Sequence, residues 1–134
     1  MDEVLKDIGP PHLELRYLLL KYFNAWRTQS TELIEQLFDQ NASYKEKAFD
    51  PPIQGLEQIK QYWRDNVIPQ RHLDVGVLDV VYSDNEVFAE WQANFTDKHG
   101  CLRRVSGILV LSPTSDLTRI ALLREYFRTD ADIK

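Results

Sequence analysis

The chain has 134 residues, of which 43% are hydrophobic and 28% are charged, and its formal net charge is −5. This composition is ordinary for a globular protein and excludes an intrinsically disordered chain. A negatively charged surface lacks the positive field that holds a phosphate backbone, so we expect no nucleic-acid partner.

Location and metal binding are also constrained by composition. The single cysteine, Cys101, excludes an intrachain disulfide and favours a reducing compartment. The three histidines, at positions 12, 72 and 99, lack the spacing of a metal site, so we expect no metal. The dense apolar patch over residues 17–23 is too short to cross a bilayer, and residues 1–12 lack the apolar core of a signal peptide. We therefore expect a cytoplasmic protein with no membrane contact.

The first third of the chain has helical periodicity. Residues 1–11 read as a flexible lead-in, because Gly9, Pro10 and Pro11 disfavour a helix there. Apolar residues then recur at steps of three and four, which predicts an amphipathic helix: Leu15, Leu18, Leu19, Tyr22, Phe23 and Trp26. Ser30 or Thr31 offers a cap for a second helix, which buries Leu33, Ile34, Leu37 and Phe38.

A short strand and a third helix follow. The strand is predicted over Ala42–Glu46, and the helix begins after Gly55 and buries Leu56, Ile59 and Trp63. Pro69 prevents that helix from continuing.

After Arg71 the apolar period changes from 3.6 to 2, which indicates strands. Four long strands are predicted, over residues 73–81, 87–95, 102–111 and 117–127, with hairpin turns between them. Helices first and antiparallel strands last indicate an α+β fold, in which three helices cover the hollow side of one strongly curved, mainly antiparallel sheet. We expect a cone with a central pocket, formed by one domain over residues 12–130.

This element order, with certain local sequences, resembles the nuclear transport factor 2-like superfamily and, within it, the SnoaL-like domains. The residues that carry the resemblance are Leu37–Tyr44, Pro51–Gly55 with Ile59 and Tyr62-Trp63, and Leu123–Arg128. The resemblance covers nearly the whole chain from about His12. It implies the fold, and it leaves the activity open because this fold hosts several enzyme classes as well as non-enzymatic proteins.

The ketosteroid isomerases of the same superfamily allow a sharper comparison. Residues 21–55 align with them without a gap, which places Tyr22 on the oxyanion-binding tyrosine and Glu46 on the proton-shuttling aspartate. The third catalytic group of those enzymes, a protonated aspartic acid, falls near Gly107, which has no side chain to donate. The resemblance therefore supplies two catalytic candidates of three.

Each candidate has a structural alternative. Glu46 follows Tyr44 by two residues, so both side chains point to the same face of the strand, and burial there would raise the pKa of the glutamate. It can equally be a solvated charge beside Lys45 and Lys47. Tyr22 can donate to a ligand oxygen, or it can be a core tyrosine with a backbone or water partner.

Aromatic residues on the inward faces predict the wall of the pocket. The expected ligand-binding residues are Trp26, Tyr44, Trp63 and Trp91, together with Arg124 if that side chain points inward. Arg124 and Glu125 face opposite ways on one strand, and an inward Arg124 would pair with Glu90 or Glu46. Such a pocket suits a flat apolar ligand with one or two oxygens.

Two functions are compatible with these residues. One is a SnoaL-like pocket protein that binds a small apolar or polyketide- or steroid-like molecule, with cofactor-free acid–base isomerisation or cyclisation by Glu46 and Tyr22. The other is a non-catalytic binding or dimeric interaction module. The superfamily commonly pairs through the outer face of the sheet, which here would carry Phe88, Glu90, Gln92, Ile108 and Val110, so we expect a homodimer.

Overall fold

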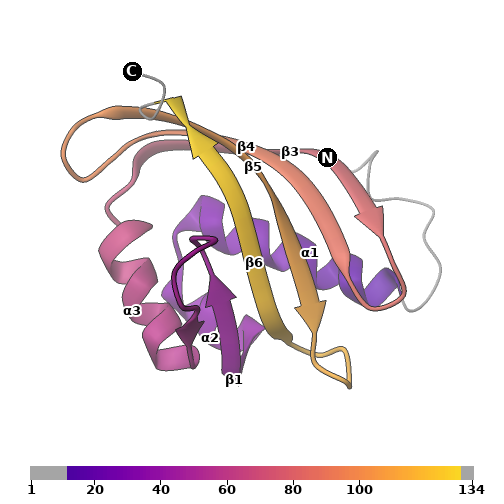
Figure 1. Ribbon diagram of the computed structural model, residues 1–134. Helices are drawn as coiled ribbons and strands as arrows, with labels where there is room; N and C mark the ends of the chain where they lie inside the picture. The colour runs from indigo at the N-terminus through magenta and orange to yellow at the C-terminus, as the bar shows by residue number, and fades with distance from the viewer. Residues whose placement is uncertain (1–11, 131–134) are drawn as a thin grey trace.

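The computed structural model describes residues 12–130, and the predicted lead-in over residues 1–11 lies outside this range. Three helices, α1 (His12–Thr28), α2 (Thr31–Leu37) and α3 (Leu56–Asn66), pack against one six-stranded sheet (Figure 1). The strands are β1 (Phe38–Lys45), β2 (Ile53–Gln54), β3 (Arg71–Tyr82), β4 (Val87–Thr96), β5 (Leu102–Pro113) and β6 (Ile120–Thr129). Among the described residues no helix is long and apolar enough to cross a membrane.

The helices follow the predicted stripes. On α1 the buried residues include the whole predicted set, namely Leu15, Leu18, Leu19, Tyr22, Phe23 and Trp26. At the start of α2 the hydroxyl of Ser30 accepts a 3.1 Å hydrogen bond from the backbone N–H of Leu33, which satisfies one of the free donors of the first turn. On α3, Ile59 and Trp63 are fully buried.

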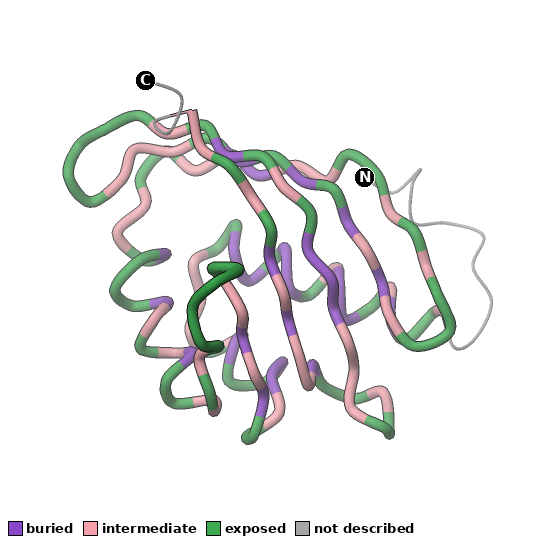
Figure 2. Tube along the Cα trace, in the orientation of Figure 1, coloured by how far each residue is buried: buried purple, intermediate pink, exposed green. Residues whose placement is uncertain are grey.

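The sheet has the strand order β2-β1-β6-β5-β4-β3. Strands β3 to β6 form an antiparallel meander, and β1 pairs in parallel with β6, the last strand of the chain. The sheet curls around the helices, so that one face is concave (Figures 1 and 2). Buried and exposed positions alternate regularly along β4, whereas β5 has three consecutive buried residues at 109–111. The predicted α+β cone is confirmed, with a sheet that is antiparallel except for the β1–β6 pair.

The main differences from the prediction concern strands β1, β2 and β6. Strand β1 begins at Phe38, directly after α2, because Phe38 already has extended backbone angles (φ −92°, ψ 143°). The two-residue strand β2 was not predicted. Strand β6 begins at Ile120 and not at Leu117, because Leu117 takes a left-handed conformation (φ 64°) within the preceding turn.

Candidate functional site

A cavity of about 340 Å³ lies between the helices and the concave face of the sheet. Its volume falls at the lower end of the range for small-molecule sites. Eight aromatic side chains line it: Tyr22, Trp26, Tyr44, Tyr62, Trp63, Trp91, Phe95 and Phe127. Five charged residues also line it: Glu46, Asp97, Lys98, Arg103 and Glu125. The cavity is therefore a largely aromatic chamber with a few ionisable groups.

The periodicities of the helix and of the strand explain why these side chains line one cavity. Tyr22 and Trp26 are one helical turn apart on α1, so both project from its buried side. Tyr44 and Glu46 lie two residues apart at the end of β1, and both line the cavity. The structure therefore brings both catalytic candidates, Tyr22 and Glu46, to the same cavity.

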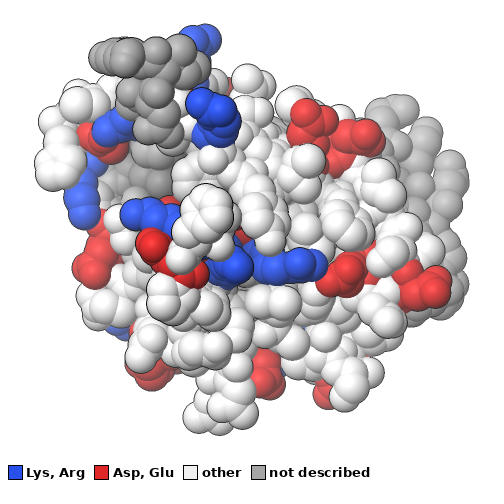
Figure 3. All heavy atoms as spheres, in the orientation of Figure 1, with Lys and Arg blue, Asp and Glu red and all other residues white. Residues whose placement is uncertain are grey.

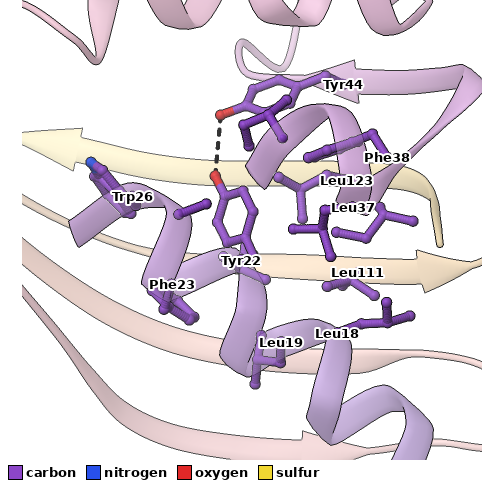
Figure 4. Close-up of a cluster of buried hydrophobic side chains, with 14 of the residues drawn as sticks. Leu18, Leu19, Tyr22, Phe23, Trp26, Leu37, Phe38, Tyr44, Leu111 and Leu123 are labelled. Atoms are coloured by element: carbon purple, nitrogen blue, oxygen red, sulfur yellow. Dashed lines mark hydrogen bonds between the residues drawn. The ribbon is translucent and has the colours of Figure 1, made fainter. Parts of the chain in front are cut away.

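The interior end of the cavity contains a carboxyl group bonded to two tyrosines. Glu125 on β6 is 5% exposed, and its Oε1 accepts a 2.5 Å hydrogen bond from the hydroxyl of Tyr44. The hydroxyl of Tyr22 lies 3.3 Å from the same Oε1 and 3.3 Å from the hydroxyl of Tyr44, so its one proton serves one acceptor at a time. Tyr22 and Tyr44 point toward one another in Figure 4. The second oxygen of Glu125, Oε2, has no hydrogen-bond partner among the described residues.

Burial is the largest cause of the raised pKa values of Glu125, Tyr22 and Tyr44. It raises the pKa of Glu125 to about 7, a rise that the Tyr44 hydrogen bond opposes and the nearby charge of Glu46 reinforces. Burial also raises the pKa of Tyr22 and of Tyr44 well above their usual value, and the charge of Glu125 adds to both shifts. The tyrosines are consequently neutral donors near pH 7, while Glu125 is divided between its acid and its carboxylate.

The second carboxyl group, Glu46, is half-buried and lines the cavity. Its charge acts on Tyr62 of α3, whose pKa is raised first by burial and then by the charges of Glu46 and Glu125. Glu46 and Tyr22 therefore have different neighbours in the cavity. Glu46 interacts with Tyr62, and Tyr22 lies against Glu125 and Tyr44.

Arg124 does not line the cavity, which corrects the expectation that it faces a ligand. Its guanidinium donates a 3.1 Å hydrogen bond to Glu86, and not to Glu90 or Glu46 as predicted. Arg124 pairs with Val110 on the other face of the sheet, because alternation along β6 places Leu123, Glu125 and Phe127 toward the interior.

Glu125 and Tyr62 are the site residues that sequence reasoning missed. The signal for Glu125 was present, since it lies midway between two inward apolar positions, Leu123 and Phe127, on a strand with a period of two. For Tyr62 no comparable signal exists, because it lies on the flank of the apolar stripe of α3, beside the fully buried Trp63.

Position 107 has no room for the protonated aspartic acid that the comparison with ketosteroid isomerases places near it. Gly107 pairs with Trp91 and Phe127, two residues of the cavity wall. A Cβ atom at Gly107 would lie 2.3 Å from the carbonyl oxygen of Tyr126 and 2.6 Å from the Cβ of Phe127. The buried acid of this cavity comes instead from Glu125, on the adjacent strand.

The mouth of the cavity lies at the β4–β5 hairpin and the end of α3, where Asn66, Lys98 and His99 are exposed. Asp97 accepts a 2.8 Å hydrogen bond from Nε of Arg103 here, and Lys98 Nζ lies 3.4 Å from the carbonyl oxygen of Asp65. Within residues 12–130 no group of three or more metal-ligating side chains is found. Ionisable groups thus occupy both ends of the cavity, with aromatic rings between them.

Solved structures with this fold include proteins that act on, or are bound to, small molecules. One, provisionally assigned as a SnoaL-like polyketide cyclase from Jannaschia sp. CCS1, is 12% identical with a TM-score of 0.79, covering 96% of this chain and 93% of its own. SalBIII, an epoxide hydrolase/cyclase-like enzyme of pyran ring formation in the polyether salinomycin, is 14% identical with a TM-score of 0.76, covering 88% and 93%.

A third structure, RV0760c from Mycobacterium tuberculosis, is in complex with estradiol-17β-hemisuccinate. It is 13% identical with a TM-score of 0.73, covering 84% of this chain and 92% of its own. At these identities the three structures show a shared fold. No curated protein matches the sequence. The sequence profile of the SnoaL-like domain matches residues 19–128, which is most of the chain, and the fold agrees with it. The chain belongs to the SnoaL-like domain family.

Proposed function

We propose that the protein binds a small, largely apolar molecule carrying an oxygen, and that the cavity performs acid–base chemistry on it without a metal or organic cofactor. The observation that carries the proposal is Glu125, a buried carboxyl group whose pKa of about 7 lets it act as an acid near neutral pH. A carboxyl group matched to the working pH is what general acid catalysis requires.

The two carboxyl groups have different surroundings, and this difference suggests a division of roles. Glu46, half-buried and close enough to Tyr62 to raise its pKa, takes a proton from a carbon atom next to the ligand's carbonyl group and returns it to another carbon of the same ligand. Glu125 in its acid form donates a hydrogen bond to the oxygen on which negative charge develops. The ligand is thereby isomerised with no net gain or loss of protons.

The hydroxyl groups of Tyr22 and Tyr44 support Glu125 in this scheme. Each can donate to its carboxylate form, so they hold the side chain in place and limit the rise of its pKa. This role replaces direct donation from Tyr22 to the ligand, because the Tyr22 hydroxyl already has Glu125 and Tyr44 as neighbours.

The ligand class is suggested by the wall of the cavity. Trp26, Trp63 and Trp91 present broad apolar surfaces that suit a flat ring system. A polyketide- or steroid-like molecule is such a ring system, and the related structures that carry a cyclase assignment or a bound estradiol derivative support this choice.

The proposal is tested by identifying the ligand and then removing each carboxyl group. Mass spectrometry of the purified protein should detect an apolar ring compound, and thermal-shift screening of cyclic ketones should rank its analogues. Glu46→Gln should lower the turnover of bound ligand by at least about 100-fold, as expected for loss of a general base. Unchanged turnover in Glu46→Gln would remove the assigned role.

We also propose that the protein forms a cytoplasmic homodimer through the outer face of the sheet, whether or not the cavity is catalytic. Ile108 and Tyr126 pair across β5 and β6 there, and they are 47% and 42% exposed. Val110, predicted on this face, is buried. Light scattering should give the dimer mass for the wild type and the monomer mass for Ile108→Lys; a monomeric wild type would refute the homodimer.

A small-molecule partner is preferred over a nucleic acid. The view in Figure 3 shows positive and negative side chains interspersed among wide uncharged areas. On this face the pattern gives no extended positive surface, and the net charge of −5 also disfavours binding to a phosphate backbone. An electrophoretic mobility assay at low salt should detect no shift of DNA or RNA.

A further inference from the structure

The two carboxyl groups of the cavity lie on neighbouring strands. In the parallel β1–β6 register, Tyr44 pairs with Leu123 and Lys45 pairs with Arg124, so one further step brings Glu46 beside Glu125. The charge of Glu46 raises the pKa of Glu125, as expected for two carboxyl groups placed so close together. The cavity thus contains a pair of adjacent, mutually repelling acids.

No lysine or arginine among the described residues forms an ion pair with either acid. In residues 12–130 the ion pairs formed by lysine and arginine join other carboxylates, and none reaches Glu46 or Glu125. Two adjacent carboxylates without a cation are costly in a buried site. When the cavity is empty, the pair can relieve this repulsion by keeping a proton on Glu125.

The Oε2 atom of Glu125 is a second reason to expect a positively charged or hydrogen-bond-donating ligand beside the two acids. The side chain is 5% exposed, it lines the cavity, and its Oε2 has no hydrogen-bond partner among the described residues. Oε2 is not among the fully buried atoms that lack a partner, so it is accessible from the cavity. A ligand in the cavity can therefore reach this oxygen.

The aromatic wall favours the same kind of ligand. Tyrosine and tryptophan faces attract cations, most strongly where water is excluded. Tyr44 and Tyr62 pack with ring centroids 5.4 Å apart beside the two acids, and Trp63 lies 6.0 Å from Tyr22. Rings and carboxylates thus surround the interior end of the cavity from α1, α3 and β1.

We propose that the ligand of this cavity is an organic cation, an apolar molecule that carries a protonated amine or a quaternary ammonium group placed between Glu46, Glu125 and the tyrosine rings. This inference rests on the proposed function in one respect, the binding of an apolar ring system, and it adds to that molecule a positively charged nitrogen that Glu125 meets in its carboxylate form. The basic residues at the mouth do not oppose it, because Arg103 is bonded to Asp97 and Lys98 is exposed at the opposite end.

The charge of the ligand gives the proposal a distinctive pH dependence. Facing Glu125 are Tyr22 from α1, Tyr44 and Glu46 from β1 and Tyr62 from α3, while its partner on β5 is the apolar Leu109. The tyrosines stay neutral, so Glu125 is the group of this cluster with a pKa near 7. A permanent cation should therefore bind more tightly as the pH rises from 6 to 8 and Glu125 loses its proton. A neutral ketone that accepts from the acid form should show the reverse trend.

Calorimetric titration with phenethyltrimethylammonium and with 4-phenyl-2-butanone, each at pH 6, 7 and 8, tests this inference. We expect the ammonium compound to gain about tenfold in affinity over this range, and Glu125→Gln to bind it at least tenfold more weakly with no pH dependence. Glu46→Gln should also weaken it. The control Glu90→Gln, an exposed carboxyl on β4 that does not line the cavity, should leave its affinity unchanged.

The outcomes separate the two proposals. Binding of the ketone without binding of the ammonium compound overturns the cationic ligand and leaves the proposed function standing. Failure of both compounds to bind overturns the cationic ligand and counts against the proposed function as well. Ammonium binding that Glu125→Gln and Glu46→Gln do not weaken, with both variants unfolding cooperatively, places the cation elsewhere and overturns the assignment.

Discussion

Tyr44 and Glu125 are 81 residues apart in the sequence, and the hydroxyl of Tyr44 donates a 2.5 Å hydrogen bond to Glu125 Oε1 inside the cavity. The bond joins β1 to β6, the parallel pair that brings the last strand of the chain beside the first. It forms only when the sheet is complete, so the acidity of Glu125 and the stability of the fold are linked.

Replacing Glu125 by glutamine should change how stability depends on pH. In the folded protein Glu125 has a pKa of about 7, above the ordinary value of 4.5 that applies to the unfolded chain. Between these values the folded state keeps a proton that the unfolded state has lost, so the wild type loses stability as the pH rises through this window. The loss amounts to about 3 kcal/mol and levels off above pH 7.

Urea denaturation at pH 4.5, 6, 7 and 8.5 measures this effect. The difference in unfolding free energy between Glu125→Gln and the wild type should move in favour of the variant by about 3 kcal/mol across the series. Glu90→Gln, whose carboxyl group is exposed, should follow the wild-type curve. Parallel curves for Glu125→Gln and the wild type would show that the pKa of Glu125 is not raised.

Removing the two tyrosine hydroxyls should have unequal effects. Tyr44→Phe loses the short bond to Glu125, which should cost about 1.5–3 kcal/mol and raise the pKa of Glu125 further, because this bond lowers it. Tyr22→Phe loses contacts of 3.3 Å and should cost less. The pH at which the unfolding free energy levels off should therefore rise more in Tyr44→Phe than in Tyr22→Phe.

A tyrosine on the surface provides the matched control for these variants. Tyr17 is 57% exposed, so Tyr17→Phe should stay within about 0.5 kcal/mol of the wild type. Equal upward shifts in Tyr22→Phe and Tyr44→Phe would mean that the two hydroxyls share Glu125 evenly, contrary to the distances.

Replacing Glu46 by glutamine should make Glu125 more acidic. The negative charge of Glu46 raises the pKa of Glu125, and its removal should bring that pKa below about 7. Carbon-13 NMR of the labelled glutamate carboxyl groups follows the titration directly, with Glu125 assigned by its loss in Glu125→Gln. An unchanged titration in Glu46→Gln would contradict the interaction between the two acids.

The helices could be predicted from the sequence because their buried faces repeat with the helical period. Tyr22 and Trp26 belong to such a stripe on α1, and Ile59 and Trp63 to another on α3. The start of β1 could not be predicted in this way. Phe38 continues the apolar spacing of α2, so its buried position fits a helix as well as the strand that it begins.

The cavity was only partly predictable for a related reason. Alternation showed that either Arg124 or Glu125 faces inward, and the choice depended on the register of β6, which pairing with β1 and β5 determines. Glu125 is the inward residue because two tyrosine hydroxyls meet it there, while Arg124 reaches Glu86 on the other face. Contacts between residues so far apart in the sequence cannot be predicted from the local spacing of apolar residues.

Gly107 should tolerate no side chain, which explains why the acid of the related isomerases cannot occupy this position. In Gly107→Ala the added Cβ meets backbone of β6 at 2.3 Å, so the strands must separate beside Phe127. We expect a loss of about 1–3 kcal/mol or more in urea denaturation. Gly76→Ala on β3 is the matched control, because nothing lies within 4 Å of its added Cβ, and it should be neutral or stabilising by up to about 1 kcal/mol. Equal stabilities for the two variants would show that β5 and β6 do not approach so closely, and an aspartic acid at position 107 would then be compatible with the fold.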